Sequence, residues 1–441
     1  MKYEIIKATS GPKHHLFGFH DIVAFNKSGD KILSVETDVI NRPPLANEEF
    51  GVGYALWEEQ RFIELGKTVA LNYPQGARQQ WLSDTEFIVN NRIGNHWGAD
   101  IYDVTVGKKI GSIDNTAHCV TKDGKWAYGI NYARLFRLGG YGYNGLPDKF
   151  ISEAIPLKDG IYKTEIATNH SDLLVSIGDV AQCDAETSAN NGSHHYVTHL
   201  LLSPNNKRIA FLHRFFLADG GIRTRLMTVG TDGSDLRCLA YGFLSHYDWR
   251  DENNIFIWGR AGSSIDVMRT NPLFSNPLVR PLLRGVKSLV RIVLGHSKSI
   301  SKHFLMVGDT DDKSIIPFAE DILLEDGHPM CCPTNRNIMI CDTYPHKETN
   351  TRTLFFYDFT KNAKNEIGEY YMGKEQVDMT LAEQFLAGID ESVLSFVSIE
   401  QMSFTRSGLH CDLHPRWDAY GKMVAFDSIH EGTRQIYIVK R

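Results

Sequence analysis

One pattern of polar and apolar positions recurs along the chain: a histidine, a short apolar stretch, a polar turn and a β run. The three clearest copies begin at His199, His328 and His414, and in each the residue ten places later opens the β run. Two further copies, at His118 and His246, have a turn that is one residue shorter. Short apolar runs bounded by turn residues are typical of strands. The spacing therefore predicts one repeated β unit.

Two more copies complete the repeat. One begins at Arg78, with arginine in the place of histidine, and the first begins at His20, two places early. A second β run usually follows before the next copy, as in GADIYDV, TLFFYDF and RQIYIVK. Hairpin-rich units that repeat about every 40–60 residues are typical of propeller blades. We therefore predict an all-β fold, a single seven-bladed β-propeller domain over residues 1–441; a multi-sheet sandwich is the alternative.

Two stretches interrupt the repeat. Residues 135–160 are rich in glycine and tyrosine and predict a long loop. Residues 267–308 hold seven Arg or Lys residues and no Asp or Glu, and within them apolar residues recur at helical spacing. This pattern predicts a basic amphipathic helix inserted in the propeller. Such a helix packs on the propeller or covers one mouth; alternatively, residues 277–295 contact an anionic membrane surface peripherally.

Composition narrows the class of protein. Apolar residues make up 42% of the chain and charged residues 23%, which is typical of a folded soluble protein. The net charge of −6 argues against a globally basic protein, so we expect no nucleic-acid partner. We find no signal peptide and no apolar run of membrane-spanning length, and the seven cysteines form no CxxC pair. We therefore expect a cytoplasmic protein with reduced thiols, with peripheral contact to the inner membrane as a second expectation.

The recurring histidine is the strongest chemical signal. Five of the seven copies carry it in the same register: His118, His199, His246, His328 and His414. Rotation about a propeller axis brings equivalent positions together near one mouth of the channel. Neutral imidazole is a common ligand of divalent metals, so His246, His328 and His414, with His199 as a fourth, predict a site for Mn²⁺, Zn²⁺ or Ca²⁺. The alternative is a ring of hydrogen-bonded histidines that holds water.

Other polar residues are expected at the same mouth. The segment HHLFGFHD places His15 and His20 beside Asp21, and a carboxylate orients an imidazole. Tyr132 and Tyr196 lie in two further polar segments near repeat histidines. Arginines suited to bidentate anion binding accompany them, although each alone is more often structural; they are Arg78, Arg134, Arg214, Arg250 and Arg416.

The sequence contains no GxGxxG after a strand, no GxxxxGK[ST], no GxSxG and no HExxH, so nucleotide-dependent, serine-hydrolase and zincin chemistry lack support. Several motifs in combination do resemble a known group: HHLFGFHD, QGARQQW, NYARLFRL, SHYDWR, EDGH and DLHPRWDAYGKMVAFDSIHEGTRQIY. They are similar to an uncharacterised group of bacterial seven-bladed β-propellers that often accompanies genes for surface-polysaccharide synthesis. That group is related to TolB-type propellers and oligogalacturonate lyases.

The resemblance implies a metal site with two differences. Oligogalacturonate lyases hold Mn²⁺ with three histidines and a glutamine, and motif matching places His328 and His414 on two of these ligands. The last-blade pattern of that family then requires Gln and a second His, where this chain has Cys411 and Arg416. Either His246 and His199 replace the missing ligands, or no metal is bound.

Together these features predict a metal-assisted polysaccharide or oligosaccharide lyase acting by β-elimination at a uronate, with an acidic saccharide as partner. Arg416 and the metal engage the carboxylate, His15 or His20 is the base, and Tyr132 or Tyr196 is the proton donor. One alternative is a glycoside hydrolase, for which carboxylates are available at Asp21, Asp248 and Asp412. The other is a non-catalytic propeller that binds glycans or serves as a scaffold in surface-polysaccharide synthesis.

Overall fold

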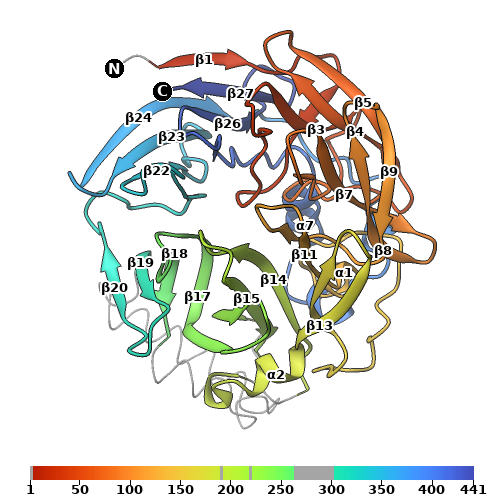
Figure 1. Ribbon diagram of the computed structural model, residues 1–441, viewed down its shortest axis with the longest axis vertical. Helices are drawn as coiled ribbons and strands as arrows, with labels where there is room; N and C mark the ends of the chain where they lie inside the picture. Colours follow the sequence, from red (N-terminus) through yellow and green to blue (C-terminus); the bar gives the residue numbers. More distant parts are fainter. Residues whose placement is uncertain (1–2, 189–191, 218–220, 263–301) are drawn as a thin grey trace.

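A computed structural model describes residues 3–188, 192–217, 221–262 and 302–441. The described chain is mostly β, and its strands form six antiparallel sheets arranged around a common centre (Figure 1). Four sheets have four strands that follow one another in sequence. They contain β2 (His14–Leu16), β3 (Lys31–Thr37), β4 (Phe50–Leu56) and β5 (Arg61–Thr68); β6 (Gln80–Trp81), β7 (Glu86–Ile93), β8 (His96–Asp103) and β9 (Lys108–Ile113); β10 (Cys119–Val120), β11 (Trp126–Ile130), β12 (Gly160–Glu165) and β13 (His170–Ser176); and β21 (Met330–Cys331), β22 (Ile338–Asp342), β23 (Thr351–Asp358) and β24 (Ala363–Tyr371).

A fifth sheet joins the two ends of the chain. The N-terminal strand β1 (Glu4–Lys7) pairs with the last strand β27 (Gln435–Lys440), which continues into β26 (Met423–Ser428) and β25 (Arg416–Trp417). The first and last strands therefore lie side by side (Figure 1). This pairing satisfies the backbone groups of strands that would otherwise be exposed edges.

The sixth sheet has seven strands: β14 (His195–Leu202), β15 (Arg208–Phe216), β16 (Ile222–Gly230), β17 (Arg237–Trp249), β18 (Asn254–Ala261), β19 (His303–Gly308) and β20 (Ile315–Phe318). The long strand β17 pairs with β16 through its first half and with β18 through its second half. The sheet thus divides at β17 into two groups of four strands that share this strand.

Apolar side chains hold neighbouring sheets together. Ile340 and Phe356 of one sheet, for example, pack in one cluster with Val424 and Tyr437 of the next. Both faces of these inner strands are buried, which is why segments such as IMIC and VAF read as unbroken apolar runs. All seven cysteines are free thiols.

Helices account for a small share of the described residues. They are α1 (Tyr132–Arg137), α2 (Ile177–Gln182), the 3-10 turn η1 (Ala185–Thr187), α5 (Ala382–Leu386), α6 (Glu391–Leu394) and α7 (Ile399–Arg406). Helix α1 occupies the start of the predicted loop at 135–160. Of the predicted basic helix at 267–308, residues 267–301 lie outside the described residues, as does the proposed membrane contact at 277–295. Residues 303–308 form strand β19, so the helix prediction is wrong there.

A helical insertion that the sequence reading missed follows β24. Residues 374–410, which we call the strap, carry α5, α6 and α7 and pack against α1. Phe385 of the strap meets Phe136 of α1 at a ring separation of 6.1 Å, and Asp390 accepts a hydrogen bond from Arg137 at 2.9 Å. The strap therefore links the end of one sheet to a helix from a distant part of the ring.

Candidate functional site

Five histidine side chains from different parts of the chain gather into one buried group, which we call the histidine cluster: His20, His199, His246, His328 and His414. The ring of His20 lies between 5.5 and 6.2 Å from each of the other four. His328 contacts His246 at 4.2 Å and His414 at 4.4 Å between ring centroids. The structure therefore brings His246, His328 and His414 together, as the repeat predicted.

The backbone at the cluster departs from regular strand geometry. His199 and His246 lie where the register of β14 and β17 shifts, and His199 and His414 have positive φ angles of 58° and 43°. Residues other than glycine adopt this conformation uncommonly, and histidine is among those that do so more often. A bulge redirects a side chain that would otherwise follow the alternation of the strand.

Two glycines allow the loops of the cluster to approach closely. A Cβ atom on Gly327 would lie 1.8 Å from the backbone oxygen of Asp342, and one on Gly18 would lie 2.8 Å from that of Gln75. Gly18 also has a φ of 114°. Any side chain at either position would displace the loop that carries His328 or the loop that leads into His20.

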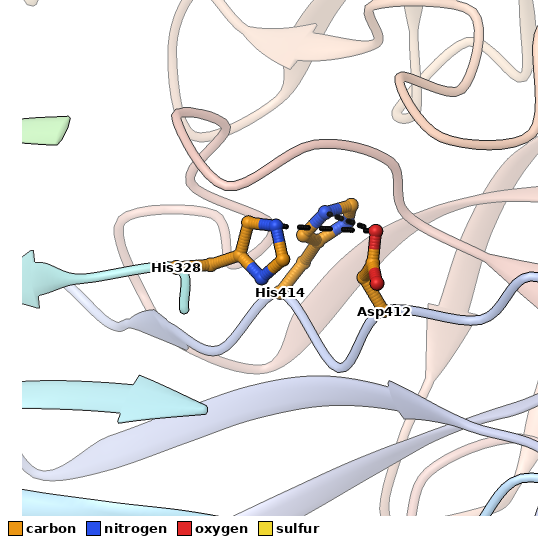
Figure 2. A group of neighbouring side chains, drawn as sticks. All are labelled: His328, Asp412 and His414. Carbon is orange, nitrogen blue, oxygen red and sulfur yellow. Dashed lines mark ion pairs between the residues drawn. The ribbon is translucent and has the colours of Figure 1, made fainter. Parts of the chain in front are cut away.

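His328 and His414 form, with Asp412, the group best suited to hold a metal ion. One donor atom from each residue lies within 4.8 Å of the others. The Asp412 carboxylate is 3.6 Å from Nε2 of His414 and 3.9 Å from Nε2 of His328. Figure 2 shows both imidazoles directed toward this carboxylate, with Asp412 and His414 on one loop and His328 on another. From the sequence, Asp412 is predicted only as a carboxylate of the alternative glycoside hydrolase and not as a metal ligand.

Hydrogen bonds at Nδ1 hold three of these imidazoles in place. Nδ1 of His414 donates to the carbonyl oxygen of Gly18 at 3.0 Å, which leaves the lone pair on Nε2. Nδ1 of His328 lies 2.8 Å from Asp342, and Nδ1 of His246 lies 2.9 Å from Asp326. A histidine that ligates a metal through one nitrogen commonly donates the other N–H to a carboxylate or carbonyl.

The second ring nitrogens of His328 and His414 are not hydrogen-bonded in the part of the chain that the structure describes. Both of these Nε2 atoms are buried. Burial lowers the pKa of both imidazoles well below the usual value, so each is neutral and can act as a ligand. Two neutral imidazoles and one carboxylate form a donor set that suits Mn²⁺ or Zn²⁺. These residues therefore fit a divalent metal.

Asp342 joins the two ligand loops. Its carboxylate accepts hydrogen bonds from the backbone and the ring of His328 and from the backbone N–H groups of Leu413 and His414. Burial raises the pKa of this carboxyl group. A single buried side chain thus sets the separation of His328 and His414.

Arg352 holds Asp412, the third residue of the metal donor group, in place. Its guanidinium lies 2.5 Å from Asp412 and over the ring of Tyr344 at 5.2 Å. Burial opposes ionisation of Asp412, but the charge of Arg352 holds the pKa of this carboxyl well below its usual range. Asp412 is therefore an anion, which is the form that binds a cation.

Two further side chains of the site have unused polar atoms. Both ring nitrogens of His20 and two guanidinium nitrogens of Arg416 are buried without a partner in the described part of the chain. Burial lowers the pKa of Arg416 to about 10, and burial together with the Arg416 charge lowers the pKa of His20. Buried polar groups nearly always have partners, so these atoms mark a place for a ligand or water.

The other predicted catalytic residues lie in networks of their own. His15 of β2 contacts Gln435 at 3.0 Å and Glu36 at 3.2 Å. The Tyr132 hydroxyl lies 2.8 Å from Nδ1 of His118. Tyr196 is buried, and burial raises its pKa. None of these three makes a ring contact with the histidine cluster among the described residues, so of the predicted catalytic set only His20 and Arg416 belong to the site.

Two of the predicted substrate-binding arginines are engaged by the protein itself. Arg78 binds Asp21 through two hydrogen bonds of 2.7 and 2.9 Å. Arg134 directs its guanidinium to Asp148 and to four backbone oxygens. Both are buried, and these contacts indicate structural roles.

The other two arginines differ from each other. Arg250 donates to Asn337 at 2.7 Å and lies over the ring of Phe359 at 4.4 Å, and none of its contacts in the described chain involves the histidine cluster. Arg214 is half-buried, its Nε has no partner within the described ranges, and its charge lowers the pKa of His199, to which burial contributes most. The charge of Arg78 also lowers the pKa of His199, so Arg214 and Arg78 both influence the cluster.

Only some of the predicted metal ligands belong to the metal donor group. His328 and His414 belong to the metal donor group, whereas His199 and His246 do not. His199 packs on Phe19 at 4.9 Å and bonds to Thr198. Sequence reasoning missed Asp326, Asp342, Arg352 and Tyr344, because only the repeat histidines were aligned and these residues hold no repeated position. The alternation in DLHPRW, which places Asp412 and His414 two residues apart, was the one available signal for Asp412.

Comparison with known proteins identifies structural relatives only. No family model and no curated protein matches the sequence. The oligogalacturonate lyase of Vibrio parahaemolyticus is similar at a TM-score of 0.55 and 11% identity, over 100% of this chain and 97% of that chain. An oligogalacturonate lyase in complex with manganese gives 0.55 and 9%, over 100% and 96%. TolB of Acinetobacter baumannii, at 0.35 and 11% over 77% and 64%, is too distant to support a statement. The similarity supports a propeller-type fold.

No helix among the described residues is long and apolar enough to cross a membrane.

Proposed function

We propose that the chain is a metal-assisted glycan lyase that cleaves an acidic saccharide by β-elimination at a uronate. One observation carries this proposal: two neutral imidazoles with unpartnered Nε2 atoms face an ionised carboxylate. They do so in a chain similar over its full length to a manganese-bound oligogalacturonate lyase. We further propose that the five separate sheets and the two halves of the seven-stranded sheet are seven propeller blades.

The proposed chemistry uses the free atoms of the site. A divalent metal on His328, Asp412 and His414 would neutralise the uronate carboxylate and so acidify the neighbouring C–H bond. Arg416, with two unpartnered guanidinium nitrogens, binds the same carboxylate. His20, whose ring nitrogens are both free, accepts the proton from that carbon.

The electrons of the broken C–H bond then form a carbon–carbon double bond, and the bond to the glycosidic oxygen breaks. The leaving oxygen takes up a proton. The ring of Tyr344 lies 5.8 Å from those of His246 and His328, and burial raises the pKa of its phenol. It is therefore protonated and able to donate. Tyr132 is less suited because its hydroxyl is held by His118.

Incubation with oligogalacturonates and other uronate-containing oligosaccharides tests the proposal. With Mn²⁺ we expect the ultraviolet absorbance of an unsaturated uronate to rise, and we expect chelation to abolish it. His414→Ala removes one donor and should abolish the signal, whereas His170→Ala, at an exposed histidine of β13, should not.

Two results would contradict the proposal. New reducing ends without unsaturated product would favour a hydrolase. Saccharide binding without any product, in protein shown to contain metal, would favour a non-catalytic glycan-binding role.

A further inference from the structure

A cleft of about 520 Å³ lies beside the metal donor group. The start of β23 with the segment before it and the residues just after β24 form one side, the end of the strap forms another, and the turn between β26 and β27 completes it. Its lining includes Arg352, Met372, Lys374, Phe404, His410 and Ile429. A cleft of this volume is within the usual range for small-molecule sites.

The inner end of the cleft adjoins the metal donor group. Arg352 and His410 both line the cleft, and both contact Asp412, Arg352 at 2.5 Å and His410 through Nδ1 at 3.6 Å. Asp412 in turn faces His328 and His414. Asp412, a member of the metal donor group, therefore contacts two residues that line the cleft.

The outer end of the cleft presents groups that suit a carboxylated sugar. Phe404 of α7 is 41% exposed, although it is a large apolar residue, and its ring meets His410 edge-on at 5.5 Å. Lys374 is exposed, and within the described ranges it forms no ion pair. An aromatic face packs against the apolar face of a pyranose ring, while an ammonium group binds a carboxylate.

The strap forms part of the wall of the cleft. The five histidines are buried, and the strap packs across α1 on the side of the ring that carries Phe136. The cleft runs along the strap where α7 ends and the chain returns to Asp412. A substrate longer than one sugar needs room outside the histidine cluster, and the cleft provides it next to Asp412.

We propose that this cleft is a binding subsite for the sugar unit adjacent to the one at the histidine cluster. The ring of that unit packs on Phe404, and its carboxylate lies near Lys374. This inference rests on the proposed function, because it assigns the same acidic saccharide to a second position.

Binding of mono-, di- and trigalacturonate to the full-length chain with Mn²⁺, measured by calorimetry, tests the subsite. We expect Phe404→Ala and Lys374→Ala each to weaken binding of the trisaccharide by about fivefold to tenfold, and to leave binding of the monosaccharide unchanged. Lys374→Arg should restore most of the affinity. Two matched controls, Phe396→Ala on the exposed side of the strap and Lys361→Ala, should bind like the unaltered chain.

Equal trisaccharide affinity in Phe404→Ala, Lys374→Ala and the unaltered chain, within twofold, would overturn the inference. So would an equal loss for the monosaccharide, because that result places both residues at the first sugar. Failure of the proposed function has a different signature: binding that depends on Phe404 and Lys374 but yields no unsaturated product. Thermal unfolding of each variant checks that it is folded.

Discussion

Two buried polar groups of this chain differ in how many of their polar atoms form hydrogen bonds. The first, which we call the arginine cluster, consists of Arg134, Arg137, Asp148 and Asp390. Arg137 binds Asp148 through Nε at 3.0 Å and Nη2 at 2.9 Å, and its Nη1 reaches Asp390 at 2.9 Å. The five guanidinium hydrogens of Arg134 are directed at one carboxylate and four backbone oxygens.

The second group, the histidine cluster, is also buried, but within the described chain it has nitrogens without a hydrogen-bond partner on His20, His328 and His414. A protein gains nothing for stability by burying polar atoms without partners. The comparison therefore teaches that residue type alone does not mark a site. Arginines with complete hydrogen bonds hold the fold together, and histidines with free nitrogens are arranged for a ligand.

The largest expected effect is on catalysis. His20→Gln removes the proposed base while keeping a polar side chain of similar length. We expect the rate of uronate elimination to fall roughly 10²–10⁴-fold, because a positioned base contributes about that factor. Steady-state kinetics measures the rate, and metal analysis should give unchanged Mn²⁺ content. A rate within threefold of the unaltered chain would remove His20 from the mechanism.

The next effect is on stability and concerns the arginine cluster. Asp148→Ala leaves Arg134 and Arg137 buried without their shared carboxylate, and we expect the free energy of unfolding to fall by about 3–5 kcal/mol. Urea denaturation measures this value. His20→Gln should change it by less than about 1 kcal/mol, since few bonds are lost. Equal destabilisation by both variants would erase the distinction between the two clusters.

A smaller effect is expected on metal affinity when Asp342, which holds residues of the histidine cluster through hydrogen bonds, is replaced. Asp342→Asn keeps the size of the side chain, but it weakens the bonds that hold His328 and the loop of His414. We expect Mn²⁺ affinity to fall about 10–100-fold, as for other residues that orient metal ligands. Metal titration measures the affinity, with Asp358→Asn on the outer end of β23 as control. Unchanged affinity would show that Asp342 does not position the donors.

The smallest effect concerns pH. Burial lowers the pKa of His199 well below the unfolded value of about 6.5, so below this pH the unfolded chain binds a proton that the folded chain does not. Stability contributed by the neutral ring is therefore present above about pH 6.5 and is lost as pH falls. His199→Asn removes the group whose protonation differs between the folded and the unfolded chain. Asparagine tolerates the positive φ at this position.

We expect the loss of stability between pH 6.5 and 5.5 to be smaller by about 1 kcal/mol in His199→Asn than in the unaltered chain. Urea denaturation at the two pH values in the presence of a chelator measures it. An identical pH dependence in the two proteins would show that His199 is charged or exposed in the folded state.

The β architecture was largely predictable from the sequence. The β runs predicted to open at Ile209, Ile338 and Val424 correspond to strands β15, β22 and β26, because the same spacing of turn and apolar residues produces the same hairpin each time. The strap was not predictable in this way. Its helices are short, and they are held by contacts with α1, which lies far away in the sequence. Instead, the basic residues at 267–301 led to a helix prediction in another part of the chain.

At the site, the histidines could be predicted and their partners could not. A repeated residue is visible in one sequence, so the proximity of His246, His328 and His414 followed from rotational symmetry. Asp342 and Arg352 do not recur at equivalent positions of the repeat. Nothing in the sequence therefore distinguishes them from charged residues that form ion pairs elsewhere. Arg134 and Arg416 looked alike in sequence, yet one is saturated with hydrogen bonds and the other is not.

The sequence by itself determined that equivalent imidazoles from separate hairpins meet in the interior, because periodic turn and apolar positions fix where each inner strand starts. The tertiary structure alone decided which of them can hold a metal. That depends on which nitrogen each neighbouring carboxylate or carbonyl occupies and on Asp412 lying opposite two free Nε2 atoms. Such distances arise from packing between distant segments, and no local pattern encodes them.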